Sequence, residues 1–449
     1  MKPTRKLVVS LIAGAASALL TPSALAQDVV WPGFRGPTGD GVVSGAGHPT
    51  SWSMTEDGQE NIAWAVEVPG ASWSSPVVVD DTVYVVSAIA PWFDRPAPFR
   101  GAGGGNSGEP AADADFAMMA FSLDTGEQLW SKTLATMVPK EPTHPSNTFA
   151  TESPTTDGER VYAHFGAIGL VVAVDLEGNE VWRKDVGAYS HTAGFGTGSS
   201  VVVHDGVLIA HSDNTKESFI VGFDAATGDE KWRQERDRGS SWASPLLVER
   251  DGGDQVVVPG PNAVTAYNPA NGEMLWKATG FGGSFSASAV SDGDFVYFGN
   301  SGPGRRGPLI SISLDAEGEF DADPDDDRVR WFASSQGLTF SSPVIVDGVL
   351  YGARGSFFAA HSCEDGERVF RTRLPDSSEI VASAWSVGDT VYVMNENGIT
   401  FAIEAGEEFK LVSTNTIEGD LFSGTPSVAK GALLIRGADK LYCIRSPGS

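Results

Sequence analysis

The chain has 449 residues, of which 41% are hydrophobic and 20% are charged, a composition typical of a folded globular protein rather than a disordered one. Its formal net charge of −27 argues against nucleic acid as a ligand, because binding nucleic acid requires Lys and Arg to neutralise phosphates. With only Cys363 and Cys443 present, the protein is not a disulfide-stapled scaffold.

The first 26 residues have the three-part layout of a cleaved secretory signal. Lys2, Arg5 and Lys6 precede an apolar run over residues 7–20, and small residues follow up to Ala26. Cleavage near Ala26 would change the net charge to −30. No other segment approaches the roughly 20 apolar residues that a membrane span needs. We therefore expect a periplasmic or secreted protein that does not insert into the membrane.

Residues 27–60 are predicted to form an N-terminal extension, and from residue 61 onward the sequence repeats one unit. In each unit a tight turn precedes a strand with an aromatic residue, and these residues recur 39 to 55 positions apart, a spacing typical of four-stranded propeller blades. Three strands precede each of them, for example "WSSPVVV", "TVYVVSA" and "VVAVD". We call these aromatic residues the anchors: Trp130, Trp182, Trp232, Trp276, Trp331, Phe370 and Phe409.

The two ends of the repeat are predicted to share one unit. The last unit, residues 424–445, has only three strands, whereas the strand around Trp64 has no partner strands before it. Pairing them leaves no open sheet edge in the ring. The sequence therefore predicts an all-β chain in which residues 61–449 form an eight-bladed β-propeller closed by the N-terminal strand. The anchors, with Trp64, should pack between neighbouring blades.

The two faces of such a ring are expected to differ. In a meander, the loops between second and third strands and the connections between units lie together on what we call the long-loop face; the tight hairpin turns form the tight-turn face, which should be acidic. We expect a partner to bind the long-loop face. Its aromatic rings either form a funnel under the insert of residues 90–114 or fill gaps between blades. The candidate residues are Trp73, Glu152, Trp242, Phe285, Phe340, Arg95, Arg100, Arg305 and Arg306.

Other patterns in the sequence are weaker. His204 and His211 are seven residues apart across a hairpin turn, which we interpret as structural rather than metal-binding. The run "DADPDDD", residues 321–327, has alternating carboxylates but lacks the Gly of a calcium loop, so a solvated acidic turn is favoured. Cys363 and Cys443 fall in different units and should be free, buried thiols. No metal ion or cofactor is predicted.

The repeated pattern "SSPVV…VY…ALD..TG...W" resembles the pyrroloquinoline-quinone-type repeat over about residues 60–445. This repeat occurs in quinoprotein alcohol dehydrogenases and in the outer membrane protein assembly factor of the β-barrel assembly machinery. The segments "WPGFRGPTGDG", residues 31–41, and "IRGADKLYCI", residues 435–444, further resemble a group of exported propellers with the same repeat. The resemblance implies a propeller fold.

The departures from both sub-families are informative. Quinoprotein dehydrogenases hold their cofactor under a disulfide between adjacent cysteines, over a Trp floor and beside a calcium held by Glu, Asn and Asp, with an Asp base; here no two cysteines are adjacent. The assembly factor carries a lipid-attachment cysteine, which does not occur beside the expected cleavage site. The residues of neither sub-family can be transferred to this chain.

Three classes of function are therefore open. We favour an exported, non-catalytic monomer that acts as a binding or assembly scaffold for envelope or periplasmic proteins. The alternatives are a quinone-dependent oxidoreductase with a divergent site and a propeller that binds or cleaves carbohydrate in the aromatic funnel. Fold by itself does not choose among them.

Overall fold

The computed structural model describes residues 29–43, 47–93, 95–99, 110, 112–302, 305–376 and 378–447. The predicted signal, residues 1–26, and Arg100 lie outside these ranges. Within them the chain is all-β, with the short 3-10 turn η2 (Thr192–Gly194). In this described part of the chain, no helix has the length and apolar character needed to cross a membrane.

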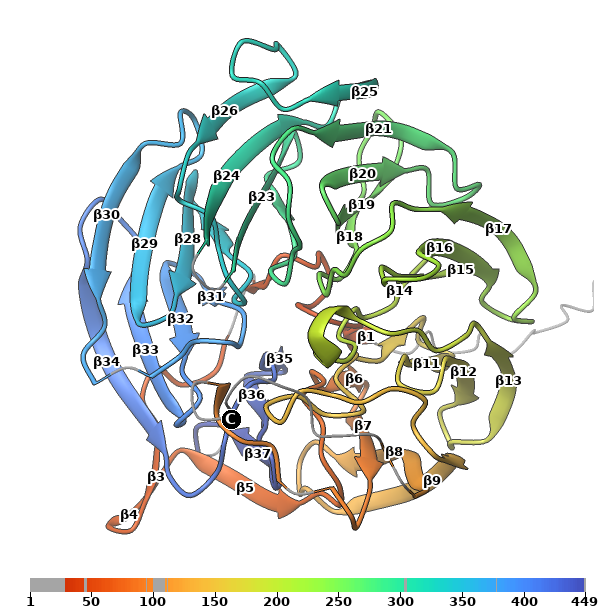
Figure 1. Ribbon diagram of the computed structural model, residues 1–449. Coiled ribbons are helices and arrows are strands. Elements are labelled where there is room, and N and C mark those ends of the chain that lie inside the picture. Colours follow the sequence, from red (N-terminus) through yellow and green to blue (C-terminus); the bar gives the residue numbers. More distant parts are fainter. Residues whose placement is uncertain are drawn as a thin grey trace, which may run out of the picture.

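The strands form eight sheets, and Figure 1 shows them arranged in a ring around a central axis. The first sheet contains β1 (Val29–Trp31), β6 (Val77–Val79), β7 (Thr82–Ile89), β8 (Ala114–Ser122) and β9 (Gln128–Met137). The second contains β10 (Thr155–Thr156), β11 (Arg160–Phe165), β12 (Leu170–Asp175) and β13 (Glu180–Asp185). The third contains β14 (Val202–His204), β15 (Val207–Ser212), β16 (Phe219–Asp224) and β17 (Glu230–Glu235). The fourth contains β18 (Leu246–Val248), β19 (Gln255–Gly260), β20 (Ala263–Tyr267), β21 (Met274–Thr279) and β25 (Gly318–Asp321).

The other half of the ring continues in the same way. The fifth sheet contains β22 (Val290–Ser291), β23 (Phe295–Gly302), β24 (Arg305–Ser313) and β26 (Val329–Ala333). The sixth contains β27 (Val344–Val346), β28 (Val349–Arg354), β29 (Phe357–Ser362) and β30 (Arg368–Arg373). The seventh contains β2 (Val42–Val43), β31 (Trp385–Val387), β32 (Thr390–Met394), β33 (Ile399–Glu404), β34 (Lys410–Ile417), β3 (Ser53–Thr55) and β4 (Gly58–Glu60). The eighth contains β35 (Ser427–Ala429), β36 (Ala432–Arg436), β37 (Lys440–Ile444) and β5 (Ile62–Glu67).

The eighth sheet joins the two ends of the repeat, as predicted. β5 pairs antiparallel with β37, and Trp64 lies opposite Cys443. Both cysteines are free and buried, also as predicted. Their surroundings leave the thiols inert, because burial raises the pKa of both Cys363 and Cys443 to about 12.

The anchors pack between neighbouring sheets, as predicted. The indoles of Trp64 and of four anchors donate their Nε1–H to a backbone carbonyl of the following sheet at 2.8–3.1 Å; these pairs are Trp64–Leu123, Trp130–Leu176, Trp182–Ala225, Trp232–Pro269 and Trp331–Cys363. Trp276 instead donates to Gln255 Oε1 within its own sheet. The rings of Phe370 and Phe409 contact each other across the sixth and seventh sheets, with centroids 6.0 Å apart.

A turn glycine of the following sheet lies against each of the five indoles that donate across to that sheet. At Gly272 the backbone φ is +72°, and a Cβ atom would come within 2.4 Å of Trp232 Cε3. Both the conformation and the space therefore require glycine. The same arrangement repeats for Gly126 on Trp64, Gly178 on Trp130, Gly228 on Trp182 and Gly366 on Trp331. The turn-plus-aromatic repeat is thus a contact between sheets.

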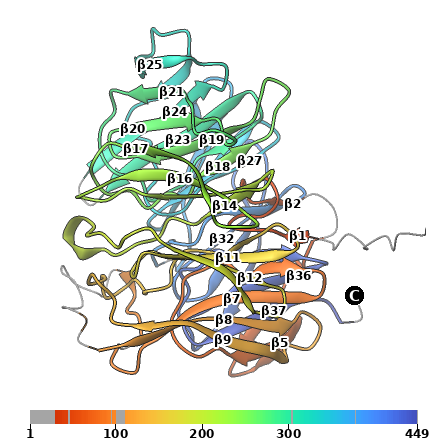
Figure 2. The same cartoon turned by 90° about the vertical axis from the view of Figure 1, so that its right-hand side faces the viewer.

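The N-terminal extension belongs to the ring. β1 pairs with β6 of the first sheet, and the Pro32 carbonyl accepts the backbone N–H of Thr156 in the second at 2.8 Å. β2 then pairs parallel with β31 of the seventh sheet. Residues 29–43 therefore cross the axis, and the side view places β1 and β2 at one side of the ring (Figure 2).

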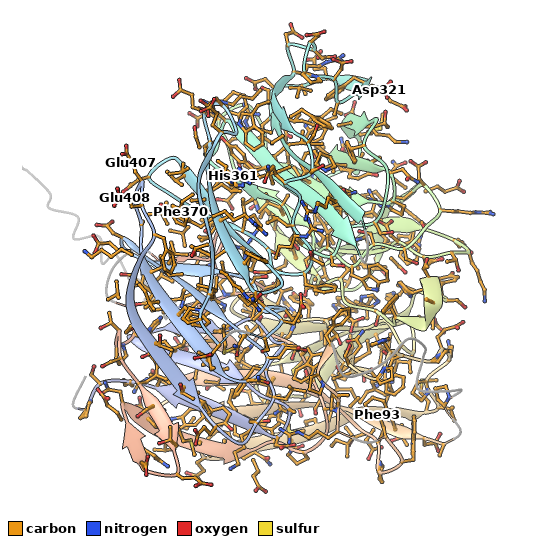
Figure 3. All side chains as sticks on the ribbon, turned by 60° about the vertical axis from the view of Figure 1, so that its left-hand side comes forward. Phe93, Asp321, His361, Phe370, Glu407 and Glu408 are labelled. Carbon is orange, nitrogen blue, oxygen red and sulfur yellow. The ribbon has the colours of Figure 1, made fainter. Side chains whose placement is uncertain are left out.

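The tight-turn face carries exposed acidic residues. Asp124, Asp157 and Glu177 are exposed in turns of the first and second sheets. Glu407 and Glu408 are exposed in the turn between β33 and β34, at the edge of the molecule in Figure 3. The run of residues 321–327 is an exposed turn in which Arg328 binds Asp326 at 2.6 Å and lowers the pKa of that carboxyl to about 2.

Candidate functional site

A cavity of about 530 Å³ lies on the axis. Its upper lining comes from the end of a second strand at Asn300, from the loop between second and third strands at Glu396, and from connections between sheets, such as those of His144 and Phe195. The cavity therefore opens on the long-loop face. Its size falls within the roughly 300–1,000 Å³ of small-molecule sites.

The N-terminal segment closes the opposite end of the cavity. Phe34 lines it from below. The next residue, Arg35, is buried and donates to the backbone carbonyls of Ala384, at 3.3 Å, and of Pro343, in the seventh and sixth sheets. Burial lowers the pKa of Arg35 to about 10. The guanidinium of Arg35 thus fastens the floor to the ring.

A ring of hydroxyl groups forms the lower wall. Each of its eight residues stands two positions before the first strand of a unit. In seven of them the backbone N–H donates to the hydroxyl of the next member at 2.8–3.2 Å, so that the bonds run from the first residue to the last. We call this ring the serine belt: Ser75, Ser153, Ser200, Ser244, Ser288, Ser342, Ser383 and Thr425. The belt was not predicted from the sequence, although a Ser or Thr stands at this position in all eight units.

The residue two positions before each belt residue forms a second ring, which we call the upper ring. Side chains alternate along an extended strand, so positions two apart face the same way. All eight of its members line the cavity: Trp73, Thr151, Gly198, Trp242, Ser286, Phe340, Val381 and Ser423. Three of the predicted candidates, Trp73, Trp242 and Phe340, thus meet at one mouth.

Two other predicted candidates do not line the cavity. Phe285 stands three positions before Ser288, and Glu152 stands one position before Ser153. Because side chains alternate along an extended strand, these odd offsets direct both side chains away from the axis. Phe285 fills a gap between sheets, packed against Phe281 and Phe298. Glu152 is buried behind the wall and accepts the Gly166 N–H at 3.2 Å. Burial raises its pKa to about 7.

Hydrogen bonds hold the aromatic mouth rigid. Trp73 and Trp242 donate their Nε1–H to the carbonyls of Ser146 and Gly196, at 2.9 and 2.8 Å. A further series of contacting rings runs around the mouth: Phe340–Phe99, Phe99–His144, His144–Phe195 and Phe195–Trp242, with centroids 4.5–5.9 Å apart.

Part of the 90–114 insert crosses the mouth. The Arg95 guanidinium binds Asp420 at 2.8 Å and Asp439 at 3.3 Å, near the eighth sheet. Ala97 N–H donates to the Pro145 carbonyl, and Phe99 N–H donates to Glu396 Oε1 at 2.7 Å. Residues 95–99 therefore form a strap, and the structure assigns the Arg95 side chain to fastening it.

Two further predicted arginines, Arg305 and Arg306, lie at the start of β24. Arg305 begins β24, and Arg306 next to it is exposed. Arg306 belongs to a cluster with Arg354, Arg368 and Arg371. Burial and the charges of Arg306 and Arg371 lower the pKa of Arg354, and burial and the charges of Arg368 and Arg306 lower the pKa of Arg371. The cluster lies over the fifth and sixth sheets.

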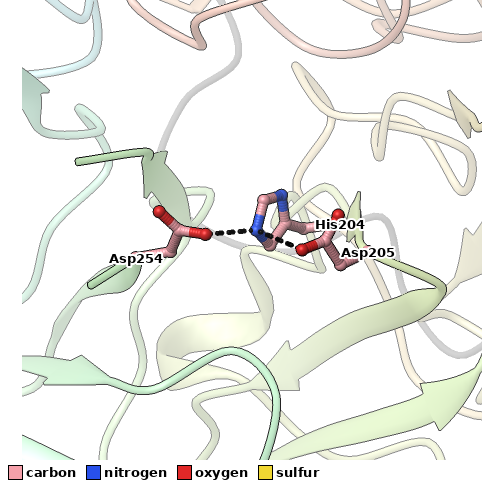
Figure 4. A group of neighbouring side chains, drawn as sticks. All are labelled: His204, Asp205 and Asp254. Carbon is pink, nitrogen blue, oxygen red and sulfur yellow. Dashed lines mark hydrogen bonds and ion pairs between the residues drawn. The ribbon is translucent and has the colours of Figure 1, made fainter. Parts of the chain in front are cut away.

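A separate group of titratable residues lies between the third and fourth sheets (Figure 4). His204 Nε2 is 2.8 Å from Asp254 Oδ2 and 3.6 Å from Asp205 Oδ2, and its Nδ1 is 3.4 Å from Glu249 Oε1. His204 thus pairs with carboxylates rather than with His211. The ligand atoms of His204, Asp205 and Asp254 are close enough to hold a divalent cation. The contacts of the His204 ring with these carboxylates explain why the three side chains lie together without a metal ion.

His211 lies in a buried network beneath the mouth. Its ring is 2.9 Å from Ser199 Oγ, but its Nε2 is 3.9 Å from Asp213 Oδ2, too far for a hydrogen bond. Arg236 holds both oxygens of Asp213, at 2.8 and 2.9 Å. Burial lowers the pKa of His211 well below its usual value. The arrangement is therefore a structural network and not a nucleophile with its base.

An all-β ring of sheets around an axial cavity defines the chain as a β-propeller. The chain belongs to the family whose model is described as outer membrane protein assembly factor BamB, which matches residues 33–214, 114–302 and 264–447. The predicted resemblance to the pyrroloquinoline-quinone-type repeat is thereby confirmed. No curated protein sequence matches the chain.

Solved structures share the fold at low sequence identity. BamB from Moraxella catarrhalis is 11% identical with a TM-score of 0.55, over 85% of this chain and 99% of that one. Quinohemoprotein alcohol dehydrogenase from Comamonas testosteroni is 12% identical with a TM-score of 0.55, over 86% of this chain and 77% of that one. The enzyme ADHIIG from Pseudomonas putida HK5 is 11% identical with the same TM-score, over 86% and 76%. Because these structures include both an assembly factor and dehydrogenases, the fold does not decide the function.

The cavity does not fit pyrroloquinoline quinone. That cofactor carries three carboxylate groups, which need cationic partners in a buried site. Among the described residues that line the cavity there is no Lys, Arg or Asp, and Glu396 adds a carboxyl group. The Trp residues lie at the mouth, while the floor is Phe34. Within the part of the lining that the structure describes, no side chain is suited to the carboxylates of that cofactor.

Proposed function

We propose that the protein is an exported, non-catalytic scaffold of the cell envelope, whose eight sheets are the blades of one closed propeller and whose long-loop face binds a protein partner. Membership of the BamB family supports this proposal. The proposal further includes cleavage near Ala26, a periplasmic or secreted location and a monomeric state, consistent with the sequence pattern.

The observation that carries the proposal is the arginine cluster on the long-loop face. In a chain with a formal net charge of −27, positive residues gather here: burial, together with the nearby charges of Arg306 and Arg368, lowers the pKa of Arg371, and burial with Arg306 and Arg371 lowers that of Arg354. A group of like positive charges attracts an acidic partner surface. Arg371 also stacks over Phe357, with its guanidinium carbon 3.7 Å from the ring centroid, which adds apolar area to the surface.

Photocrosslinking in the cells that produce the protein would test the proposal. A photoreactive amino acid replaces Arg306 or Arg371 in the cluster, and in matched controls it replaces Glu177 or Asp229 on the tight-turn face; all four positions are exposed. We expect light-dependent adducts with an envelope protein from the two cluster positions only. Adducts formed equally from the tight-turn positions, or from none of the four, would refute the proposed face.

A cofactor titration separates the scaffold from the oxidoreductase alternative. Calorimetric titration with pyrroloquinoline quinone, with and without calcium, should give no binding heat, because the cavity offers no cations for its carboxylates. Stoichiometric binding would contradict the scaffold and favour the oxidoreductase.

A further inference from the structure

We propose that the axial cavity binds a neutral carbohydrate, in the form of a mono- or disaccharide unit. The inference goes beyond the protein-binding function proposed above and rests on the chemistry of the two rings that line the cavity.

The serine belt offers hydroxyl donors to the cavity. A Ser or Thr hydroxyl has one proton to donate and two lone pairs. In the described part of the chain, every belt hydroxyl from Ser153 to Thr425 accepts a backbone N–H, and none of them donates to a protein acceptor. Six line the cavity: Ser153, Ser200, Ser244, Ser288, Ser383 and Thr425. Such a ring of fixed donors suits a ligand with many oxygen acceptors around its edge.

The upper ring adds flat apolar surfaces above these donors. Trp73, Trp242 and Phe340 stand at the first, fourth and sixth sheets. Both indoles are held by their Nε1–H bonds, so a ligand can stack on them at little cost in side-chain entropy. A pyranose ring combines a C–H face that packs on an aromatic ring with an edge of hydroxyl groups. The order of the two rings in the cavity matches this combination.

The charge of the lining favours a neutral ligand. Its titratable side chains are His144 and Glu396, within the residues that the structure describes. An acidic ligand would lose its hydration without gaining a cation. Asn300 also lines the cavity, and its side-chain amide donates to the Gly282 carbonyl at 2.6 Å, so it adds a neutral polar group to the lining.

The test is titration of the purified protein with neutral disaccharides, namely cellobiose, maltose and N,N′-diacetylchitobiose, and with glucuronate and glucosamine as charged probes. Calorimetry reports binding, and indole fluorescence reports contact with Trp73 and Trp242. We expect at least one neutral sugar to bind and to change the fluorescence, with the charged probes about tenfold weaker or worse.

Variants locate the binding. Gly198→Leu introduces a side chain into the upper ring where a Cβ atom has room, its nearest neighbour being Trp242 Cδ1 at 3.6 Å, and it should abolish measurable binding. Trp242→Leu should weaken binding by about tenfold. Two substitutions serve as matched controls and should leave affinity unchanged: Ser341→Ala, one position before a belt residue and turned away from the axis, and Trp92→Leu, outside the cavity.

Each outcome decides the proposal. Binding of a neutral sugar that Gly198→Leu abolishes and Ser341→Ala preserves supports it. Absence of neutral-sugar binding by the folded protein, preference for glucuronate, or binding that survives Gly198→Leu overturns it. Unfolding midpoints of the unliganded variants show whether each is folded. The crosslinking experiment above tests a different surface. A failure to bind sugar therefore does not affect the proposed protein-binding face.

Discussion

At the scale of single residues, the contact between an anchor indole and the turn glycine of the next sheet explains the repeat. Trp232 donates to the Pro269 carbonyl at 3.1 Å and covers Gly272. The glycine is needed both for its positive φ and for the space under the ring, and these two requirements can be separated by experiment.

The first prediction compares Gly272→Ala with Gly206→Ala. Both glycines have φ of +72°, but a Cβ atom at Gly206 would meet nothing within 4 Å. Gly206→Ala should therefore lower the free energy of unfolding by about 1 kcal/mol, the cost of backbone strain. Gly272→Ala should cost about 2–4 kcal/mol, because overpacking against Trp232 is added. Urea unfolding measures both, and equal losses would show that the indole contact adds nothing.

At the scale of elements, the N-terminal segment joins three sheets, because its strands extend the first, seventh and eighth sheets. His48 fixes this segment to the seventh sheet. Its Nε2 accepts the Trp385 Nε1–H at 3.0 Å, and its ring contacts Trp52 and Tyr392 with centroids 5.4 and 4.8 Å away. An imidazole that accepts in this way is neutral, and burial accordingly lowers its pKa to about 4.

The second prediction is acid destabilisation of this segment. An unfolded chain protonates His48 near pH 6.5, whereas the folded chain protonates it only near pH 4. The stability from His48 is thus complete above pH 6.5 and is lost as the pH falls to 4, by about 3 kcal/mol. His48→Gln, which keeps an acceptor for Trp385 but does not titrate, should remove this part of the pH dependence.

The measurement is the free energy of unfolding of the two proteins between pH 4 and 8. His164, whose pKa burial also lowers to about 4, contributes equally to both and cancels in the difference. Parallel curves for the two proteins would show that His48 does not control the loss.

At the scale of the whole molecule, two series of contacts link neighbouring sheets. The serine belt runs through all eight sheets near the axis, and five indoles, from Trp64 to Trp331, donate across to the following sheet farther out. The pairing of β5 with β37 joins the chain ends. The formal net charge of −27 opposes these contacts, because the excess carboxylates repel one another in the compact fold.

The third prediction follows from this charge. Raising the ionic strength from about 0.01 M to about 0.5 M should increase the free energy of unfolding by on the order of 1 kcal/mol, since salt screens repulsion between exposed carboxylates. Urea unfolding in sodium chloride and, as a control for specific ion binding, in potassium chloride would measure it. A fall in stability with both salts would mean that exposed ion pairs outweigh the repulsion.

The sequence by itself determined the repeat and its closure. Aromatic residues, turn glycines and strand patterns are local signals, and they recur once in each unit, so the sheets and the role of Trp64 could be predicted. The same regularity brought Trp73, Trp242 and Phe340 to one mouth, because equivalent positions of equivalent strands meet at the axis. The free state of Cys363 and Cys443 also followed from their separation by a whole unit.

Tertiary structure alone decided what surrounds the axis. Which side of a first strand faces inward depends on its register, and a displacement by one position turned Glu152 and Phe285 away from the cavity. The serine belt, the floor at Phe34, the strap at Arg95 and Phe99 and the site of His48 join residues from different sheets, in several cases hundreds of positions apart. No local pattern specifies such contacts, because they arise only when curvature closes the ring and brings the sheets together.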